Sequence, residues 1–538
     1  MKDAEDQRKH LRDGTILNLK ILNYPLTCLM NLRINNISIL LLTALYVPML
    51  FLGLFDLDEG AFAATSFQML ENNKFLVPMI GEELRLEKPV LTYWIQALSI
   101  KIWGANEFAL RLPAVLASFF WAYSFSKFIK ETDNQASSSE IYLNLLTLPG
   151  VFIISFAATA DAFLNLCITL LMIEIYRYSK NHKDIHLVKS ALFVAIGFLL
   201  KGLTIIAIGG MVALLYFAYQ RRLSSFFKLA FSIKAWSIFL LVIAPWFLLF
   251  ANKIGANELS YLFFEQTFGR FTNTFEKHNG PVYYYLIIFI FLALPYLVDI
   301  VRGVMKLDLR RNELDIFLFI WFIFVFIFFS FSSTKLPHYL IYGITPIAYF
   351  VYKHHQQIKN YKLTASSSIF FILIWLSILA LPFYLSYLAE VRESLEVSSS
   401  TLTKFKEDAS YLIFSVSMLL FFVIGSLARL NLLFVKRISS LALIAILSLK
   451  IIPIINESTQ ADIKKLGLIA SKLEGDVTMY KLNKPSFGFY ANKISYRGLE
   501  RADIILTRKD KIDSLNLNFE IISISGNYLL LRKEYDNK

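Results

Sequence analysis

Charged side chains that can bind phosphate or move protons lie in and beside two long loops of this sequence, at residues 56–108 and 252–281. The first loop holds an acidic cluster and, further along, a lysine. A carboxylate can take or orient a proton, whereas lysine offers a point charge and arginine a planar fork to an anion. Ionisable residues near a bilayer are costly, so such a set predicts a functional site. The candidates come from five segments that we expect to meet at one face: Asp58, Lys88, Asp161, Lys201, Arg270, Lys335 and Tyr339.

Each of these residues also has a structural interpretation. Asp161 could cap a helix, and Asp58 could be a solvated loop charge. The two lysines outside the helices could extend from the interface towards water, and the arginine and tyrosine could anchor the chain at the headgroups. The case for a site is their conjunction, because random anchors should not gather acids and bases from five segments at one face.

A metal site has weaker support. Glu87 and Glu265, both in the outer loops, could ligate a divalent ion, but two carboxylates alone are a weak signal. Cys28 and Cys167 both lie in apolar stretches, so neither a disulfide framework nor a cysteine metal site is indicated.

The elements that must position these residues are membrane spans. The chain has 538 residues, of which 56% are hydrophobic and only 18% are charged, with a mean hydropathy of +0.53. This composition excludes soluble, disordered and disulfide-stapled classes. Apolar stretches long enough to cross about 30 Å of hydrocarbon predict thirteen spans, at 35–55, 109–129, 141–158, 161–178, 187–202, 203–219, 234–251, 282–301, 314–332, 337–352, 366–389, 411–428 and 438–455.

Lysine and arginine in alternate loops predict the orientation. Basic residues recur in every second connection, for example Arg177 with Lys180 and Arg310 with Arg311, and basic loops face the cytoplasm. The net charge of +13 is therefore interpreted as loop orientation rather than as nucleic-acid binding. The N-terminus is expected inside the cytoplasm, and the loops that carry the candidate residues outside it.

Two outer-loop segments and the tail predict smaller elements. Residues 59–72 and 90–103 can form amphipathic helices in the interface plane. The tail is polar with short β-rich runs and predicts a soluble α/β domain at 456–538, outside the cytoplasm, after a transmembrane domain at 1–455.

Several motifs in residues 50–350 resemble those of one enzyme family. They are Asp58-Glu59-Gly60, Leu86-Glu87-Lys88-Pro89, Arg111-Leu112-Pro113, Lys201-Gly202, Gly269-Arg270-Phe271 and Lys335-Leu336-Pro337. With these, the chain resembles the polyprenyl-phosphate-sugar glycosyltransferases of the GT-C fold, of the 4-amino-4-deoxy-L-arabinose lipid A transferase type, which are related to protein O-mannosyltransferases.

The resemblance implies roles for single residues. It implies that Asp58 and Asp161 form the acidic pair of an active site, that Lys88, Arg270 and Tyr339 hold the lipid phosphate, and that Lys201 lies near Asp58. Lys335 and Arg85 are further candidates for binding substrate. This chain departs from the family pattern at Ala61-Phe62, at Arg85 where an aromatic is common, and at Glu265 where the family has a histidine.

The function that we expect is transfer of a sugar from an undecaprenyl-phosphate-type carrier to lipid A or another envelope acceptor, at the outer face of a bacterial inner membrane. A lipid-borne donor and the lack of a Gly-rich phosphate loop predict no nucleotide cofactor. The alternatives are a protein O-glycosyltransferase and a lipid or sugar transporter. A transporter predicts ionisable residues or helix breaks near mid-span in paired halves, which the sequence does not show.

Overall fold

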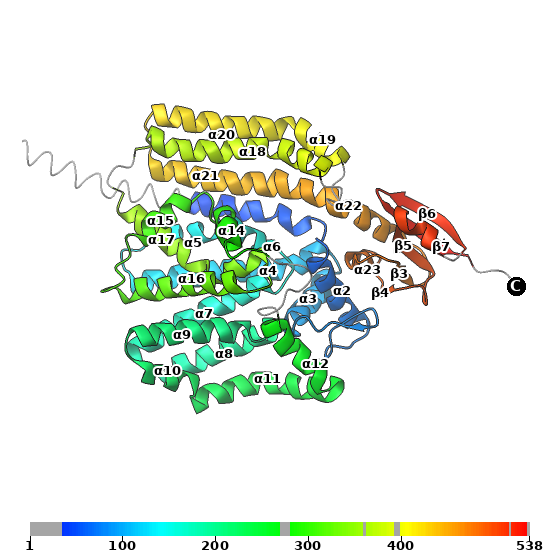
Figure 1. Cartoon of the computed structure of the whole chain (residues 1–538), viewed down its shortest axis with the longest axis horizontal. Helices are drawn as coiled ribbons and strands as arrows, with labels where there is room; N and C mark the ends of the chain where they lie inside the picture. Colours follow the sequence, from blue (N-terminus) through cyan, green and yellow to red (C-terminus); the bar gives the residue numbers. More distant parts are fainter. Residues whose placement is uncertain (1–34, 270–279, 359–361, 392–398, 516–517, 535–538) are drawn as a thin grey trace, which may run out of the picture.

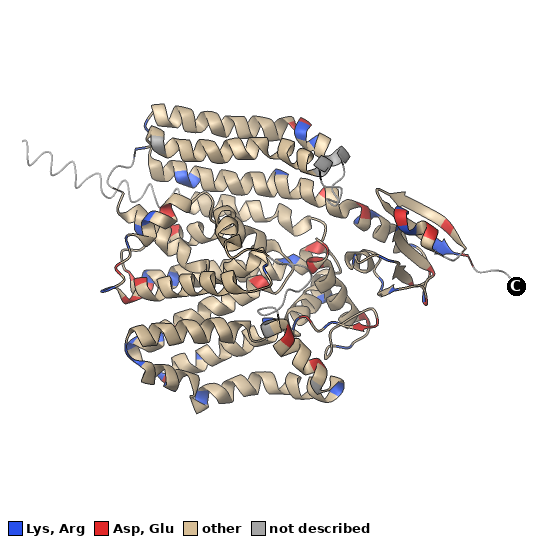
Figure 2. Cartoon of the chain, viewed as in Figure 1, with Lys and Arg blue, Asp and Glu red and all other residues tan. Residues whose placement is uncertain are grey.

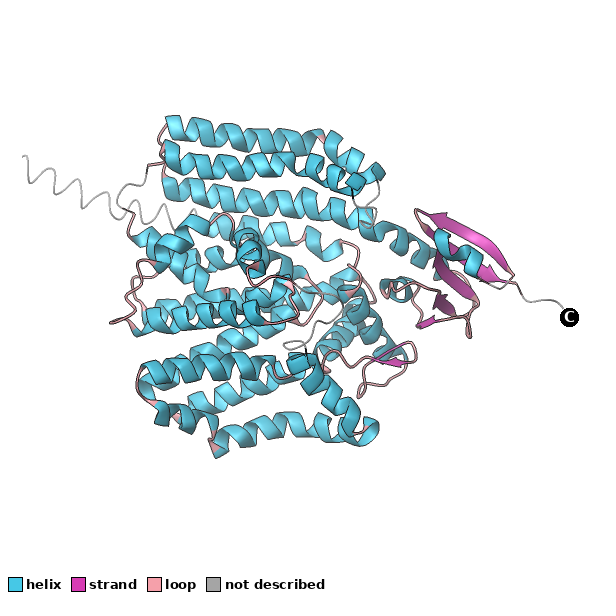
Figure 3. Ribbon diagram, in the orientation of Figure 1, coloured by secondary structure: helices cyan, strands magenta, loops and turns pink. Residues whose placement is uncertain are grey.

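The computed structural model describes residues 35–269, 280–358, 362–391, 399–515 and 518–534. Long helices lie side by side and form the body of the molecule, and a small sheet projects from one end (Figure 1). Figure 3 shows the longer strands gathered at that end. The predicted polytopic helical fold with a small C-terminal sheet is confirmed.

Within the described residues, seven helices are long and apolar enough to cross a membrane, or nine if each of two bent pairs forms one span. The pairs are α5–α6 (Ser138–Leu146 and Pro149–Phe156), bent by 74°, and α14–α15 (Tyr284–Ala293 and Leu297–Val304), bent by 109°. Each predicted span coincides with one helix or with consecutive helices. Some of these helices, such as Asn35–Phe51 and Thr204–Tyr219, are shorter than a full span, so the count of thirteen stays a prediction.

The helices of the body follow one another with short connections. Their bounds are η1 Pro48–Phe51, α4 Glu107–Thr132, α5 Ser138–Leu146, α6 Pro149–Phe156, α7 Asp161–Asn181, α8 Asp184–Lys201, α9 Thr204–Tyr219, α10 Leu223–Ala230, α11 Ile233–Ile254, α12 Ala256–Ser260, η2 Tyr261–Gly269, α14 Tyr284–Ala293, α15 Leu297–Val304, α16 Glu313–Phe331, η3 Pro337–Gly343, α17 Thr345–Gln356, α18 Ala365–Val391, α19 Ser399–Glu407, α20 Ala409–Leu427, α21 Leu432–Ile446, η4 Leu447–Ile451 and α22 Ile452–Ala470.

Polar residues mark where several of these helices begin. The side chains of Asn106 and Asn312 precede α4 and α16 and accept hydrogen bonds from the first backbone N–H groups of each helix. Such caps satisfy donors that have no partner inside the helix. Figure 2 shows most charged residues near the two ends of the helices, with a largely uncharged middle. This distribution is expected of helices that cross a bilayer.

Two short helices and a hairpin form the first outer loop. Helix α2 covers Asp58–Glu71 and α3 covers Leu91–Trp103, close to the predicted bounds, and β1 (Met79–Ile80) pairs with β2 (Glu83–Leu84) between them. The sequence predicts an interfacial helix with one apolar face, whereas α2 is buried on all sides over most of its length. Residues 59–69 of α2 are all buried, because α3 packs on one side and the C-terminal region covers another.

The C-terminal region is connected to the body through one long helix. Helices α21, η4 and α22 are continuous from Leu432 to Ala470, so the predicted boundary at residue 456 falls inside α22. A five-stranded sheet follows in the order β4-β3-β5-β7-β6. Strands β3 (Val477–Met479), β4 (Ser495–Arg497) and β5 (Ile504–Arg508) are parallel, whereas β6 (Phe519–Ser525) and β7 (Tyr528–Lys533) are antiparallel to their neighbours. The short elements α23 (Ser486–Tyr490) and η5 (Lys509–Ser514) connect the strands.

Candidate active site

A cavity of about 330 Å³ opens between the first outer loop and the body of the molecule. Its lining includes Lys88, Lys201, Tyr339 and Tyr342 together with apolar residues such as Ile208 and Phe329. The cavity therefore combines cationic and hydroxyl groups with apolar side chains, and an amphiphilic anion can bind to both. The lining residues are Glu87, Lys88, Pro89, Lys201, Thr204, Ala207, Ile208, Leu262, Gln266, Phe328, Phe329, Ser332, Tyr339 and Tyr342.

Asp161, Lys201 and Tyr342 form a hydrogen-bonded group at this cavity. The Lys201 ammonium donates to Asp161 Oδ1 at 2.5 Å and to the Tyr342 hydroxyl at 2.6 Å, and the Tyr342 hydroxyl lies 2.6 Å from the same carboxylate oxygen. Thr159 donates to the other oxygen of Asp161 at 3.1 Å. The Asp161 side chain therefore bonds partners on other segments and is more than a cap for its own helix. The resemblance implied that Lys201 lies near Asp58, which stays a prediction; the structure adds an ion pair of Lys201 with Asp161.

Helix ends explain why these three residues meet. Helix α8 ends at Lys201, and Gly202 follows at φ +63°, a conformation that favours glycine and turns the chain away. Helix α7 begins at Asp161, at the same end of the body. Tyr339 and Tyr342 lie three residues apart in the 3₁₀ turn η3, in which such residues share a face. Sequence reasoning named Tyr339 and missed Tyr342, which this spacing could have identified.

Asp58 is exposed, at the first position of α2, while the next residue is buried. Glu59 accepts two hydrogen bonds from the Arg111 guanidinium, at 2.9 and 2.6 Å, and further bonds from the backbone N–H groups of Ala158 and Phe55. Arg111 is fully buried and also donates to backbone carbonyls of residues 49–53. This buried pair fixes the start of α2 and leaves the Asp58 carboxylate accessible.

Lys88 and its neighbours continue the polar wall. The Lys88 ammonium donates to the Glu87 backbone carbonyl at 2.9 Å, and both residues line the cavity. Arg85 does not line it. Its guanidinium donates to the Tyr93 hydroxyl at 3.1 Å and lies 3.6 Å from the Glu87 carboxylate, so it links the hairpin to α3.

His338 marks the point at which the predicted residues converge. The charges of four of them, Asp58, Lys88, Asp161 and Lys201, act on its imidazole. The imidazole also packs edge-on against the ring of Tyr339, with centroids 4.9 Å apart. Four of the predicted residues, two from the first loop and one each from α7 and α8, therefore act electrostatically on one residue of η3.

Two other candidates have different surroundings. Lys335 is buried, and its ammonium donates to the backbone carbonyls of Ser330 at 2.9 Å and Ser332 at 2.7 Å, so it closes the end of α16. Arg270 lies outside the described residues. Its expected role as a phosphate ligand stays a prediction.

The side chains do not fit the divalent-metal site that we considered. Glu87 lines the cavity, but Glu265 is exposed on η2 and is not part of the lining. No group of three or more His, Cys, Asp or Glu side chains in the described part of the chain is arranged to hold a metal. Two cationic groups, those of Arg85 and Lys88, lie beside Glu87, and they disfavour a cation there.

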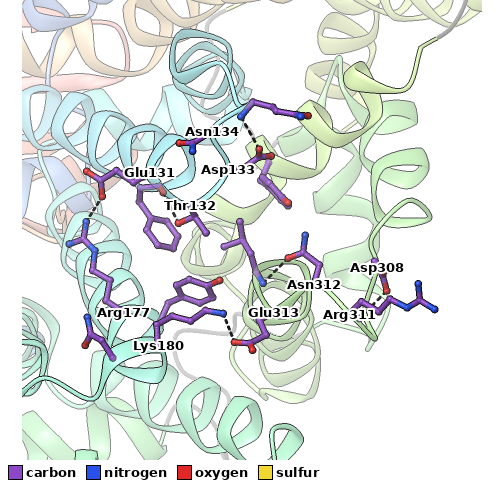
Figure 4. Close-up of a pocket in the computed structure, with 16 residues that line it drawn as sticks. Glu131, Thr132, Asp133, Asn134, Arg177, Lys180, Asp308, Arg311, Asn312 and Glu313 are labelled. Atoms are coloured by element: carbon purple, nitrogen blue, oxygen red, sulfur yellow. Dashed lines mark hydrogen bonds and ion pairs between the residues drawn. The ribbon is translucent and has the colours of Figure 1, made fainter.

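A second pocket lies at the opposite ends of α4, α7 and α16. Two ion pairs join four of its charged side chains, Arg177 with Glu131 at 2.7 Å and Lys180 with Glu313 at 2.5 Å (Figure 4). Its lining has four carboxylates and three basic groups, so it lacks the excess of positive charge that a phosphate ligand requires. The cavity at Lys88 and Lys201 is the better candidate.

Comparisons with known proteins identify relatives in sequence and in fold. Residues 87–250 match the model of a family described as dolichyl-phosphate-mannose-protein mannosyltransferase. The undecaprenyl phosphate-alpha-4-amino-4-deoxy-L-arabinose arabinosyl transferase of Erwinia tasmaniensis is 25% identical over 324 residues, which are 58% of this chain and 57% of that protein. The protein of the same name from Photorhabdus laumondii is 26% identical over 306 residues, which are 55% of this chain and 54% of that one. The match thus spans little more than half the length of these relatives.

A solved structure shows that the likeness of fold extends over almost the whole chain. The crystal structure of ArnT from Cupriavidus metallidurans bound to undecaprenyl phosphate superposes with a TM-score of 0.79 at 18% sequence identity. The superposition covers 92% of this chain and 97% of that one. The chain is therefore a multi-pass membrane protein of the GT-C fold, related to the undecaprenyl-phosphate arabinosyl transferases.

Proposed function

We propose that this protein is a glycosyltransferase that moves a sugar from a polyprenyl-phosphate carrier to an acceptor in the cell envelope. The observation that carries this proposal is the cavity at Lys88 and Lys201, in which cationic and hydroxyl groups adjoin an apolar wall that includes Ile208 and Phe329. A phosphate linked to a long isoprenoid likewise combines an anionic group, which cationic groups bind, with an apolar chain, which an apolar wall binds. The solved relative is itself described as bound to undecaprenyl phosphate.

The proposed reaction replaces one bond at the anomeric carbon by another. The acceptor oxygen attacks that carbon, the bond from the carbon to the phosphate oxygen breaks, and the lipid phosphate leaves with the electron pair. Negative charge grows on the phosphate as it leaves, and a preorganised Lys88 stabilises that charge. Arg270 is expected to add a bidentate contact.

The two acidic residues have different surroundings and therefore different proposed roles. Asp58 is exposed at the start of α2, so it can accept the proton of an acceptor hydroxyl. Asp161 Oδ1 already accepts two hydrogen bonds, from Lys201 and Tyr342. We assign Asp161 the task of holding the Lys201 ammonium at the cavity. No step of this mechanism uses a divalent ion or a nucleotide.

Two acceptor classes remain as proposals. The arabinosyl transferase names of the relatives favour lipid A or a similar envelope lipid. The name of the matching family model favours a protein. We propose the lipid acceptor first, because the two named relatives match more than half of this chain, whereas the family model is confined to residues 87–250.

The proposed location is the inner membrane of a bacterium, with the site and the C-terminal sheet on the periplasmic side. The support is the distribution of basic residues, because Arg177, Lys180 and Arg311 lie at the end of the molecule opposite the site.

Mass spectrometry of envelope fractions tests the proposal. Cells that carry the wild-type protein are compared with cells that carry Asp161→Asn, at matched protein abundance. We expect a lipid species with one added sugar that is present only with the wild type. A sugar found on protein alone would replace the lipid acceptor with a protein, and identical lipid and protein profiles would contradict the proposed function.

A further inference from the structure

The segment that precedes Asp58 is held from two sides. On the side of the body, Glu59 and Arg111 fix it as described above. On the other side, residues more than 400 positions away reach it from α22 and α23. Asn456 donates to the Gly53 carbonyl at 2.7 Å, and the Tyr490 hydroxyl accepts from the Leu54 N–H at 2.7 Å.

The Asp56 carboxylate is the centre of this second contact. One of its oxygens accepts the Ser486 backbone N–H at 3.0 Å, and the other accepts the Ser486 hydroxyl at 2.6 Å. The Asp56 backbone N–H is directed at the Gln460 side chain, at 3.4 Å. Both carboxylate oxygens are therefore engaged by one residue of the C-terminal region.

Gly60 makes this approach possible. A Cβ atom at position 60 would lie 1.9 Å from Asp56 Oδ1 and 2.7 Å from the Ser486 backbone nitrogen. Any side chain there would therefore displace the carboxylate or the backbone of α23. The glycine that follows the acidic pair Asp58-Glu59 thus has a physical reason in this chain: it leaves room for the contact between Asp56 and Ser486.

We propose that Ser486 is a positioning residue for sugar transfer, and that through Asp56 the C-terminal region sets the place of Asp58 at the start of α2. Asp58 lies two residues after Asp56 and begins α2, so a displacement of Asp56 is transmitted directly to it. Helix α2 is buried over residues 59–69, so at this end of the helix only Asp58 is exposed. The inference rests on the proposed function for the role of Asp58, whereas the contact itself can be tested without any substrate.

The charge state of Asp56 provides a second readout. Burial raises the pKa of Asp56 to about 6, while the hydrogen bonds from Ser486 and the nearby Lys484 oppose that rise and the Glu59 carboxylate adds to it. Below that pH the carboxyl group gains a proton, and one of its oxygens becomes a weaker acceptor for Ser486. Because Ser486 stabilises the charged form, removal of its hydroxyl should raise the pKa of Asp56 further.

The first experiment measures amide hydrogen exchange of residues 53–60 in the purified full-length protein. Ser486→Ala should raise the exchange of this segment at least about tenfold, whereas Ser486→Thr, which keeps a hydroxyl, should restore protection. Ser471→Ala is the matched control, because the Ser471 hydroxyl donates only within its own helix, to Leu468. Unchanged exchange in Ser486→Ala would overturn the proposal whether or not the protein transfers a sugar.

The second experiment follows transfer against pH. In Ser486→Ala we expect kcat to fall at least about tenfold with little change in the KM for the donor, and the acidic limb of the wild-type profile near pH 6 to move to higher pH. Asp56→Asn is isosteric and does not titrate, so it should lose that limb. If Ser486→Ala does not fold, the pH–rate profile of Asp56→Asn is the test. An acidic limb that is unchanged in this variant would overturn the proposal. Absence of transfer by the wild type would instead contradict the proposed function.

Discussion

The Asp161 carboxylate, the Lys201 ammonium and the Tyr342 hydroxyl stabilise one another in a place with little water. Asp161 is 7% exposed, so its negative charge depends on the lysine for compensation. Removal of one member of a buried ion pair leaves an uncompensated charge and typically costs 3–5 kcal/mol, whereas replacement of both members can be nearly neutral. Stability and catalysis can therefore be separated at this pair.

We predict that Lys201→Met destabilises the protein by about 3 kcal/mol, and that the double variant Asp161→Asn/Lys201→Met recovers most of that loss. Thermal unfolding in detergent measures the first quantity. Neither variant should transfer sugar, because the ammonium at the cavity is absent from both. Equal thermal stability of the single variant and the wild type would contradict this account of the pair.

Lys88 lines the same cavity, which we propose as the donor site. Lys88→Ala should lower kcat/KM for a polyprenyl-phosphate sugar at least tenfold, which corresponds to about 1.4 kcal/mol of transition-state stabilisation. Lys101→Ala is the control, since Lys101 is an exposed lysine at the end of α3. A loss of the same size in both variants would show that general surface charge, and not a phosphate contact, is responsible.

At the scale of elements, close helix packing fixes the frame around the site. Gly303 in α15 packs on α17, where a Cβ atom would lie 1.9 Å from the Phe350 carbonyl oxygen. This backbone contact cannot be relieved by a side-chain rotation, so the two helices would have to separate.

Gly303→Ala should therefore lower the free energy of unfolding by about 1–3 kcal/mol. Gly210→Ala in α9 is the matched control, because no atom lies within 4 Å of a Cβ there and alanine favours the helix. Thermal unfolding of the two variants side by side is the measurement. The prediction is wrong if both variants unfold at the same temperature.

The sequence predicts local elements well and distant contacts poorly. Periodicity and Pro89 placed α2 and α3 within about one residue of their observed bounds. The burial of α2 beneath α23 could not be predicted, because the partners are separated by more than 400 residues and no local pattern records such a contact. The same reason explains the ion pair of Lys201 with Asp161, which neither the residue pattern nor the resemblance predicted.

At the scale of the whole molecule, the site and the C-terminal sheet lie at one end and the paired polar pocket at the other. The basic residues near that pocket predict that its end faces the cytoplasm. A phosphatase that is active only outside the cytoplasm should therefore be active when fused after Lys538 and inactive when fused after Arg311. The reverse pattern would contradict the proposed orientation.

Cleavage of a polyprenyl-phosphate sugar at the cavity of Lys88 and Lys201 is the step on which the proposed function depends. Its most direct test is donor turnover by the purified full-length protein in nanodiscs, where no sealed compartment exists, with polyprenyl-phosphate sugars extracted from the native membranes and the native lipid fraction as acceptor. We predict that the wild-type protein releases free polyprenyl phosphate and that Lys88→Ala releases at least tenfold less. A transporter would release none under these conditions. Donor that stays intact with the wild-type protein, or equal release by wild type and Lys88→Ala, would contradict the account.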